Sequence, residues 1–211
     1  MLIFLHAGCG SATKAQTTPY FASDSWREIR LDIDPGVQPD IVGSIVDLPG
    51  IADNAYDAVF SSHNIEHLYP YEVPVALQSF RRVLKRDGHL VLACPDLESV
   101  CAHVAAGRLL EPLYNSPAGP VAALDILYGY RAAIHANSVY MAHRCGFIAS
   151  ALRDALHGAG FGMVWVRRDI SRFALSAVAI QDSGSETPLR ELVNKHFPSP
   201  GDDHQRDAQA D

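Results

Sequence analysis

The sequence predicts an α/β fold with a doubly wound, mostly parallel sheet, and three features support it. Short apolar runs within residues 2–5, 28–34, 40–47, 57–62 and 89–94 have the length of buried strands. An amphipathic helix pattern over residues 72–86 connects the last two, and this strand–helix–strand spacing favours parallel crossovers. Two further strands, at 163–167 and 174–180, are spaced as a hairpin, so one of them should be antiparallel to the rest.

The first strand runs directly into the turn Gly8-Cys9-Gly10. In an open α/β sheet, a nucleotide-like ligand binds at the carboxyl end of the first strand. Glycine lets the backbone approach a ligand closely, and exposed N–H groups can hold an anion. Taken alone, this turn is equally consistent with an ordinary connection between a strand and a loop.

The second strand ends in two acids, Asp32 and Asp34. An acid about 20 residues after the glycine turn, at the tip of the neighbouring strand, can accept both hydroxyls of a ribose. Asp34 is the second choice, because it lies two residues on along the same strand face. Residues 15–25 have loop chemistry rather than a helix for a pyrophosphate, which favours a ligand with a ribose and no phosphates.

The middle of the chain supplies the next strands and one helix. The third strand, residues 40–47, should end near Ser44, followed by the turn at Leu48-Pro49-Gly50. Residues 72–86 carry apolar residues at helical spacing, Gly88 closes the helix, and basic residues occupy its last turn. The fifth strand, 89–94, stops at Pro95.

We expect one domain over residues 1–181 and a polar, disordered tail over 182–211, with a short helix within residues 189–197. Residues 97–140 break the strand–helix pattern and are expected to form a substrate lid, the alternative being an insertion that only covers the sheet edge. The next helix, 145–157, should turn four residues inward. These are Ile148, Leu152, Ala155 and Leu156.

Composition narrows the function classes. The net charge of −7 and the lack of a basic stripe disfavour a nucleic-acid partner. No stretch is apolar over the length of a membrane span, and no secretory leader is evident. The cysteine spacings match neither a zinc pattern nor a disulfide framework, which favours reduced cysteines in a cytoplasmic protein. They are Cys9, Cys94, Cys101 and Cys145.

Residues 6–11, Asp32, residues 57–67 and residues 80–90 resemble, in order and spacing, four motifs of the class I S-adenosylmethionine-dependent methyltransferases. The resemblance extends from residue 2 to about residue 180 and implies a Rossmann-like, seven-stranded sheet ending in an antiparallel hairpin. It implies S-adenosylmethionine as cofactor and methyl transfer as activity. The chain departs from the pattern at His6, at Ala12, at Ser44 and in its poorly formed first helix.

The resemblance also implies roles for individual residues. The glycine turn would receive the methionine end of the cofactor, Asp32 would hold its ribose, Ser44 and Ile45 would border adenine, and Ser62 and His63 would line the sulfonium side. The full set expected to bind the cofactor is His6, Gly8, Cys9, Gly10, Asp32, Ile33, Asp34, Ser44, Ile45, Ser62 and His63.

His63 or His67 is the candidate general base, because neutral imidazole near pH 7 suits proton removal from an acceptor. The methyl acceptor is unidentified and expected to be a small molecule. Two other functions remain open. Residues 63–67 spell H-x-x-E-H, a zinc-peptidase pattern, although the expected context disfavours a metal site. The departures from the family pattern also permit a protein that binds the cofactor or its demethylated product without turnover.

Overall fold

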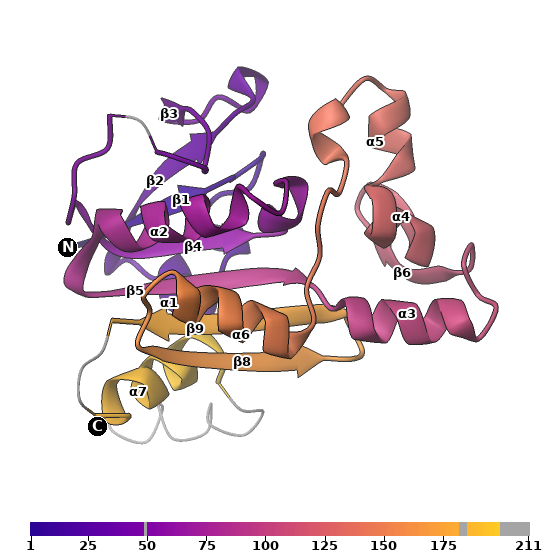
Figure 1. Cartoon of the computed structure of the whole chain (residues 1–211). Coiled ribbons are helices and arrows are strands. Elements are labelled where there is room, and N and C mark those ends of the chain that lie inside the picture. Colours follow the sequence, from indigo (N-terminus) through magenta and orange to yellow (C-terminus); the bar gives the residue numbers. More distant parts are fainter. Residues whose placement is uncertain (49, 182–184, 199–211) are drawn as a thin grey trace, which may run out of the picture.

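A seven-stranded sheet forms the centre of the protein, in the order β3–β2–β1–β4–β5–β9–β8 (Figure 1). The computed structural model describes residues 1–48, 50–181 and 185–198. β9 pairs antiparallel with both of its neighbours, and the remaining pairs are parallel, which confirms the predicted fold class. The strands are β1 (Leu2–Ala7), β2 (Trp26–Asp32), β3 (Ile41–Val42), β4 (Tyr56–Ser62), β5 (Leu84–Pro95), β8 (Met163–Asp169) and β9 (Ala174–Ile180).

Side chains of the central strands alternate between two cores, as strand geometry requires. Leu5 of β1 belongs to the larger core, under α2 (Val73–Val83) and α6 (Ala149–Gly158). Phe4 belongs to a smaller, aromatic core on the opposite face, with α1 (Pro19–Ala22) and α7 (Thr187–His196). Helices on both faces make the sheet doubly wound.

The order of the strands reverses between β1 and β4. The chain builds outward from β1 to β2 and β3, and then returns to β4 on the other side of β1. A reversal of this kind leaves a crevice at the carboxyl ends of the strands, where α/β sheets bind ligands. The glycine turn and Ser62 both lie at this edge, because they follow or end these two strands.

Several predicted boundaries were wrong for local reasons. α2 ends at Val83 rather than near Gly88, since Leu84 already has extended backbone and begins β5. Gly88 lies where the pairing of β4 with β5 shifts register. It is therefore part of an irregularity in β5 and not of a helix end. Lys85, expected in a solvated helix end, pairs with Asp57 at 2.8 Å.

Two other elements differ from expectation. β3 is limited to Ile41–Val42, and the chain from Gly43 onward turns into loop at the sheet edge. The helix expected over 145–157 begins at Ala149, so Ile148 is its N-cap and is 40% exposed instead of pointing inward. The weak first helix is confirmed. Thr17 and Thr18 separate the short 3₁₀ turn Lys14–Gln16 from α1, which has only four residues.

Residues 97–140 form a small substructure beyond the carboxyl end of β5 (Figure 1). Val100, Val121, Ala123 and Ile126 form its separate small core. Its elements are α3 (Leu97–Ala105), the hairpin β6 (Pro112–Ser116) with β7 (Gly119–Ala122), α4 (Ala123–Tyr128), α5 (Arg131–His135) and the start of the 3₁₀ turn Val139–Met141.

The short helix expected within residues 189–197 is present and begins two residues earlier. α7 (Thr187–His196) lies against the aromatic core through Leu189, Leu192 and Val193, and His196 is buried. The apolar residues recur at helical spacing, which gives this polar segment one face to bury. Residues 182–184 and 199–211 lie outside the described part of the chain. Among the described helices, none has the length and apolar character needed to cross a membrane.

Candidate functional site

A cavity of about 610 Å³ opens at the carboxyl ends of β1, β2 and β4. This volume is within the range of small-molecule sites. Gly8 and Asp32, from neighbouring strand tips, line the same cavity, as the sequence predicted. The sequence-predicted residues in its wall are Gly8, Cys9, Gly10, Asp32, Ile33, Asp34, Ser44, Ile45, Ser62, His63 and His67.

Gly8 is required by a close approach of another loop. Its φ is +70°, and a Cβ there would lie 1.4 Å from the side-chain nitrogen of Asn64. That nitrogen donates a hydrogen bond to the carbonyl of Ala7 at 3.1 Å. The two loops that follow β1 and β4 are therefore in direct contact, and a side chain at Gly8 would separate them.

The backbone N–H groups of the glycine turn are already used inside the protein. Those of Gly8 and Cys9 donate to the carbonyl of Leu31, at 2.8 and 3.1 Å. The N–H of Gly10 donates to Oδ2 of Asp32 at 2.7 Å. The expectation that exposed N–H groups of this turn hold an anion was wrong, because the second strand and its terminal acid accept these bonds.

Asp32 connects the two strand tips. Besides the bond from Gly10, its Oδ1 accepts the N–H of Asp34 at 2.9 Å. A carboxylate has about four acceptor positions, so two remain for the hydroxyls of a ligand. Asp34 does not continue the strand face, since β2 ends at Asp32. Its carboxylate caps the 3₁₀ turn Pro35–Val37 by accepting the N–H of Gly36.

Arg30 holds the two loops on either side of Asp32 in place. Its guanidinium donates to the carbonyls of Gly10 and Ala12 in the glycine loop, at 2.7 and 3.1 Å. It also donates to the carbonyls of Val37 and Gln38 in the loop after β2. The planar, multi-donor guanidinium suits this bracing role. The sequence analysis missed it, because its partners are backbone carbonyls.

His6 does not line the cavity, and its expected contact with the cofactor was wrong. Its ring is 3% exposed, with Nδ1 2.6 Å from Oε1 of Glu28 and an edge contact to Phe60. Alternation along β1 directs it to the aromatic face of the sheet, away from the turn. Burial lowers the pKa of His6, and the nearby Glu28 carboxylate only partly offsets this effect.

The loop after β4 supplies the other side of the cavity. His63 has a φ of +50°, an uncommon conformation for a residue with a side chain, and half of its side chain is exposed. Its Nδ1 lies 3.4 Å from Oε1 of the buried Glu66. Burial opposes the charged form of His63, but the Glu66 carboxylate outweighs this and raises the pKa of His63.

The H-x-x-E-H segment does not form the helix that a zinc peptidase needs. Residues Ile65–His67 form a single 3₁₀ turn, and Asn64 before it has non-helical backbone. His63 and His67 therefore do not share one face of an α-helix, and the peptidase interpretation loses its geometric basis. His67 instead directs Nδ1 to the carbonyl of Ala142, at 3.2 Å.

The far wall of the cavity comes from Tyr140, the last residue of the predicted lid segment 97–140, and from Met141 and Arg144, which the sequence analysis did not single out. The guanidinium of Arg144 stacks over the ring of Tyr69 at 4.4 Å. Its backbone N–H donates to the carbonyl of Glu66 at 2.8 Å, which joins this wall to the loop after β4. The sequence gives no signal for this contact, because Tyr69 and Arg144 lie far apart in the chain.

Residues 5–92 match the model of the methyltransferase domain family. The matched stretch contains the glycine turn, Asp32 and the loop after β4. No curated protein sequence matches the chain.

Solved structures resemble this protein in fold at low identity. A Burkholderia thailandensis 1,6-didemethyltoxoflavin-N1-methyltransferase with bound S-adenosylhomocysteine is 16% identical, covering 86% of this chain and 72% of that one, with a TM-score of 0.54. A possible histamine N-methyltransferase of Thermotoga maritima is 15% identical, with coverages of 86% and 83% and a TM-score of 0.53. A methyltransferase of Aquifex aeolicus is 13% identical, with coverages of 84% and 81% and a TM-score of 0.50.

Proposed function

We propose that the chain transfers the methyl group of S-adenosylmethionine to a small-molecule acceptor bound in the 610 Å³ cavity. The observation that carries the proposal is that the glycine turn and Asp32 share this cavity with the loop after β4. When bound, the cofactor supplies an activated methyl group on sulfur. The protein's task is then to align the acceptor and exclude water, which can contribute on the order of 7–11 kcal/mol.

The cavity wall fits the cofactor in the following arrangement. Asp32 accepts the ribose hydroxyls through its remaining acceptor positions. Ile45 is buried beside the cavity and provides an apolar surface for adenine, next to Ser44. The turn from Gly8 to Gly10 lies against the methionine end by close backbone approach, since its N–H groups are engaged elsewhere.

His63 is the better placed of the two candidate bases. It lines the cavity with half of its side chain exposed, and Glu66 lies against its Nδ1, which leaves Nε2 for the acceptor. A carboxylate that orients an imidazole is a recurring arrangement in general-base catalysis. His67 remains the second candidate. Its ring is directed by the Ala142 carbonyl, so its Nε2 is also without a proton in the neutral form.

The acceptor would occupy the end of the cavity lined by Tyr140, Met141 and Arg144. Tyr140 ends the segment 97–140, which supports a role for this segment as a substrate lid on a domain spanning residues 1–181. Arg144 offers a cation to an anionic group of a small molecule. The net charge of −7 supports a small acceptor over a nucleic acid.

Calorimetry with S-adenosylhomocysteine tests the cofactor assignment. Replacing Asp32 with alanine should weaken binding by about 1.5–3 kcal/mol, the value of hydrogen bonds to a charged group. Asp154→Ala is the matched control, because Asp154 is an exposed acid of α6 that does not line the cavity. Equal affinity of the Asp32 variant and the native chain would contradict the assignment.

A screen with isotopically labelled donor against small-molecule extracts tests the reaction itself. Transfer of label to an extract component is expected, and a His63→Ala variant should then lose roughly 10²–10⁴-fold in rate while still binding the donor. Binding without transfer to any extract would instead favour the non-catalytic alternative.

A further inference from the structure

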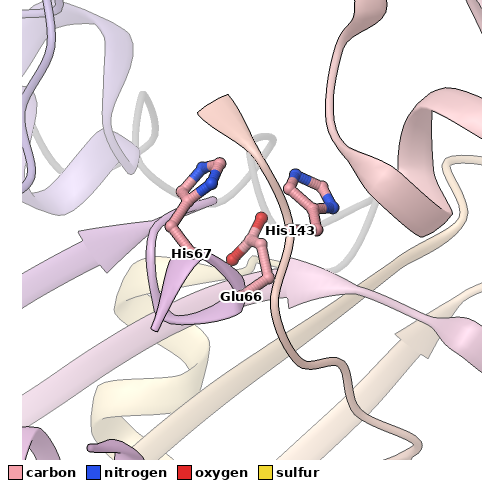
Figure 2. Close-up of side chains that lie close together, drawn as sticks. All are labelled: Glu66, His67 and His143. Carbon is pink, nitrogen blue, oxygen red and sulfur yellow. The ribbon is translucent and has the colours of Figure 1, made fainter. Parts of the chain in front are cut away.

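We propose that Glu66, His67 and His143 bind a divalent transition metal ion, of the zinc or iron(II) class, beside the cofactor cavity. Figure 2 shows the carboxylate of Glu66 between the rings of His67 and His143, with Glu66 and His67 in the turn after β4 and His143 in the loop before α6. One ligand atom from each lies within 4.8 Å of the other two. Two imidazoles and a carboxylate are a ligand set that zinc and non-haem iron enzymes use.

The spacing requires only small side-chain movements. Bonds of about 2.0–2.1 Å in tetrahedral geometry place ligand atoms roughly 3.4 Å apart. The atoms here are separated by up to 4.8 Å, so each side chain has to move by about 1 Å toward a common centre, which is within rotation about its own bonds. Three ligands leave a further coordination position for water or a substrate atom.

Both histidines are oriented as metal ligands are. Nδ1 of His67 lies 3.2 Å from the carbonyl of Ala142, and Nδ1 of His143 lies 2.6 Å from that of Ile126. A carbonyl only accepts hydrogen bonds, so each Nδ1 carries the proton and each neutral ring has its lone pair on Nε2. A hydrogen bond of this type, from the other ring nitrogen to the backbone, is the usual support of a metal-binding histidine.

Glu66 gives independent evidence for a ligand. It is 1% exposed, and neither carboxylate oxygen makes a hydrogen bond within the described residues. The approach of His63 Nδ1 to Oε1 is 3.4 Å, which is long for a hydrogen bond. Buried carboxylates without partners are costly and are found paired or bound to metals. A metal ion next to Oε2 would supply the missing partner.

The backbone holds the two halves of the cluster together. The carbonyl of Glu66 accepts the N–H groups of Arg144 and Cys145, at 2.8 and 3.2 Å, and so fixes the chain next to His143. The rings of His67 and His143 are 4.8 Å apart in an edge contact. The site is therefore assembled from elements already fixed by main-chain bonds, as a metal site requires.

Metal binding to the full chain tests the proposal directly. Protein stripped with a chelator and dialysed should take up a single Zn²⁺ per chain, measured by competition with a chromophoric chelator, and bound Co²⁺ should give visible absorption. His143→Gln, which retains a polar side chain but loses the imidazole, should weaken Zn²⁺ binding by at least the roughly 10–100-fold that loss of a supporting residue costs. Glu66→Gln should do the same.

His135→Gln is the matched control, because His135 is an exposed histidine of α5 outside the cluster, and it should bind Zn²⁺ as the native chain does. Absence of Zn²⁺ and Co²⁺ binding to the native chain at micromolar concentrations would overturn the proposal. So would full affinity in a correctly folded His143→Gln variant. His143 does not line the cavity, so S-adenosylhomocysteine binding by this variant tests the cofactor site separately.

Discussion

Two pairs of histidine rings lie in this protein at almost the same separation, with opposite surroundings. The rings of His89 and His196 are 5.0 Å apart and join β5 to α7. Those of His67 and His143 are 4.8 Å apart and join the turn after β4 to the loop before α6. Both pairs connect segments that are far apart in the sequence, so ring distance alone does not tell which pair is structural.

The hydrogen bonds of the ring nitrogens separate the two cases. In the first pair the Nε2 atoms are 2.8 Å apart, and Nδ1 of His196 lies 2.7 Å from the hydroxyl of Thr18. The two rings bond to each other and pack against Phe21, and no carboxylate among the described residues is hydrogen-bonded to either ring. In the second pair each Nδ1 lies against a backbone carbonyl, and one nitrogen of each ring lies within 4.8 Å of a carboxylate oxygen of Glu66. Rings beside a buried acid that has no hydrogen bond within the described residues indicate a ligand site. Two rings that bond to each other indicate packing.

Acidification should cause the largest change in the free energy of unfolding, and it should act through His89 and His196. Burial lowers the pKa of His89 to about 3, helped by Lys195, and lowers that of His196 to about 2, helped by the adjacent His89. Between pH 6.5 and about 3, the unfolded chain takes up protons that the folded chain does not. These two histidines therefore cost no stability above pH 6.5. As the pH falls from 6.5 toward 3, the free energy of unfolding decreases by up to about 1.4 kcal/mol per pH unit for each histidine.

Urea unfolding followed at a series of pH values measures this slope. A His89→Phe, His196→Leu double variant should have a smaller slope between pH 6 and 4 because it lacks both titrating groups, while His135→Gln should keep the native slope. A native slope in the double variant would mean that other groups cause the acid sensitivity.

Truncating one ring of the first pair should be the next largest effect. His196→Ala removes a 1%-exposed side chain and leaves His89 Nε2 and the Thr18 hydroxyl without their partners. The expected loss in free energy of unfolding is about 2–4 kcal/mol. His143→Gln, in the second pair, should cost under about 1 kcal/mol without metal, because its half-buried site tolerates a polar side chain. Equal losses in denaturant titrations would erase the distinction between the pairs.

The contrast also shows what the sequence could predict. The glycine turn, Asp32 and the loop residues Ser44 and Ile45 were predicted to share one cavity because each lies at or just after the end of a strand. Local pattern and strand order then fix where they meet. His143 is 76 positions after His67, and no local signal marks its return to the turn after β4. The same holds for His196, since only folding against the aromatic core gives the polar tail a buried face.

Two predictions about the cofactor site were wrong for the same reason. His6 was assigned to the ligand by its position in a motif, but the two-residue alternation of β1 turns it toward Glu28 on the other face. The N–H groups of the glycine turn were expected to be free, but Leu31 and Asp32 accept them. Which group accepts a backbone N–H depends on how neighbouring strands and loops are placed in the fold, and the sequence pattern does not give this information.

Metal should stabilise the protein through the second pair only. A ligand that binds the folded chain alone adds about 2.7 kcal/mol at 100 times its dissociation constant. Zn²⁺ at that excess should therefore raise the unfolding midpoint of the native chain. His143→Gln, with a site weakened at least roughly 10–100-fold, should gain at most about 1.4 kcal/mol and so show a much smaller increase. His196→Ala should show the full native increase, although it starts from lower stability. An equal increase in His143→Gln would place the bound metal elsewhere.

The smallest effect concerns the wall that connects the second pair to the cavity. Arg144→Ala removes the stacking of the guanidinium on Tyr69, an exposed contact worth about 0.5–1 kcal/mol. Its backbone bond to Glu66 is retained, so the metal cluster should keep its affinity for Zn²⁺. The variant should instead lose affinity for an anionic acceptor, measured by calorimetry once the acceptor is found. If Arg144→Ala weakens Zn²⁺ binding as strongly as His143→Gln does, the cavity wall and the cluster form one unit rather than two neighbouring sites.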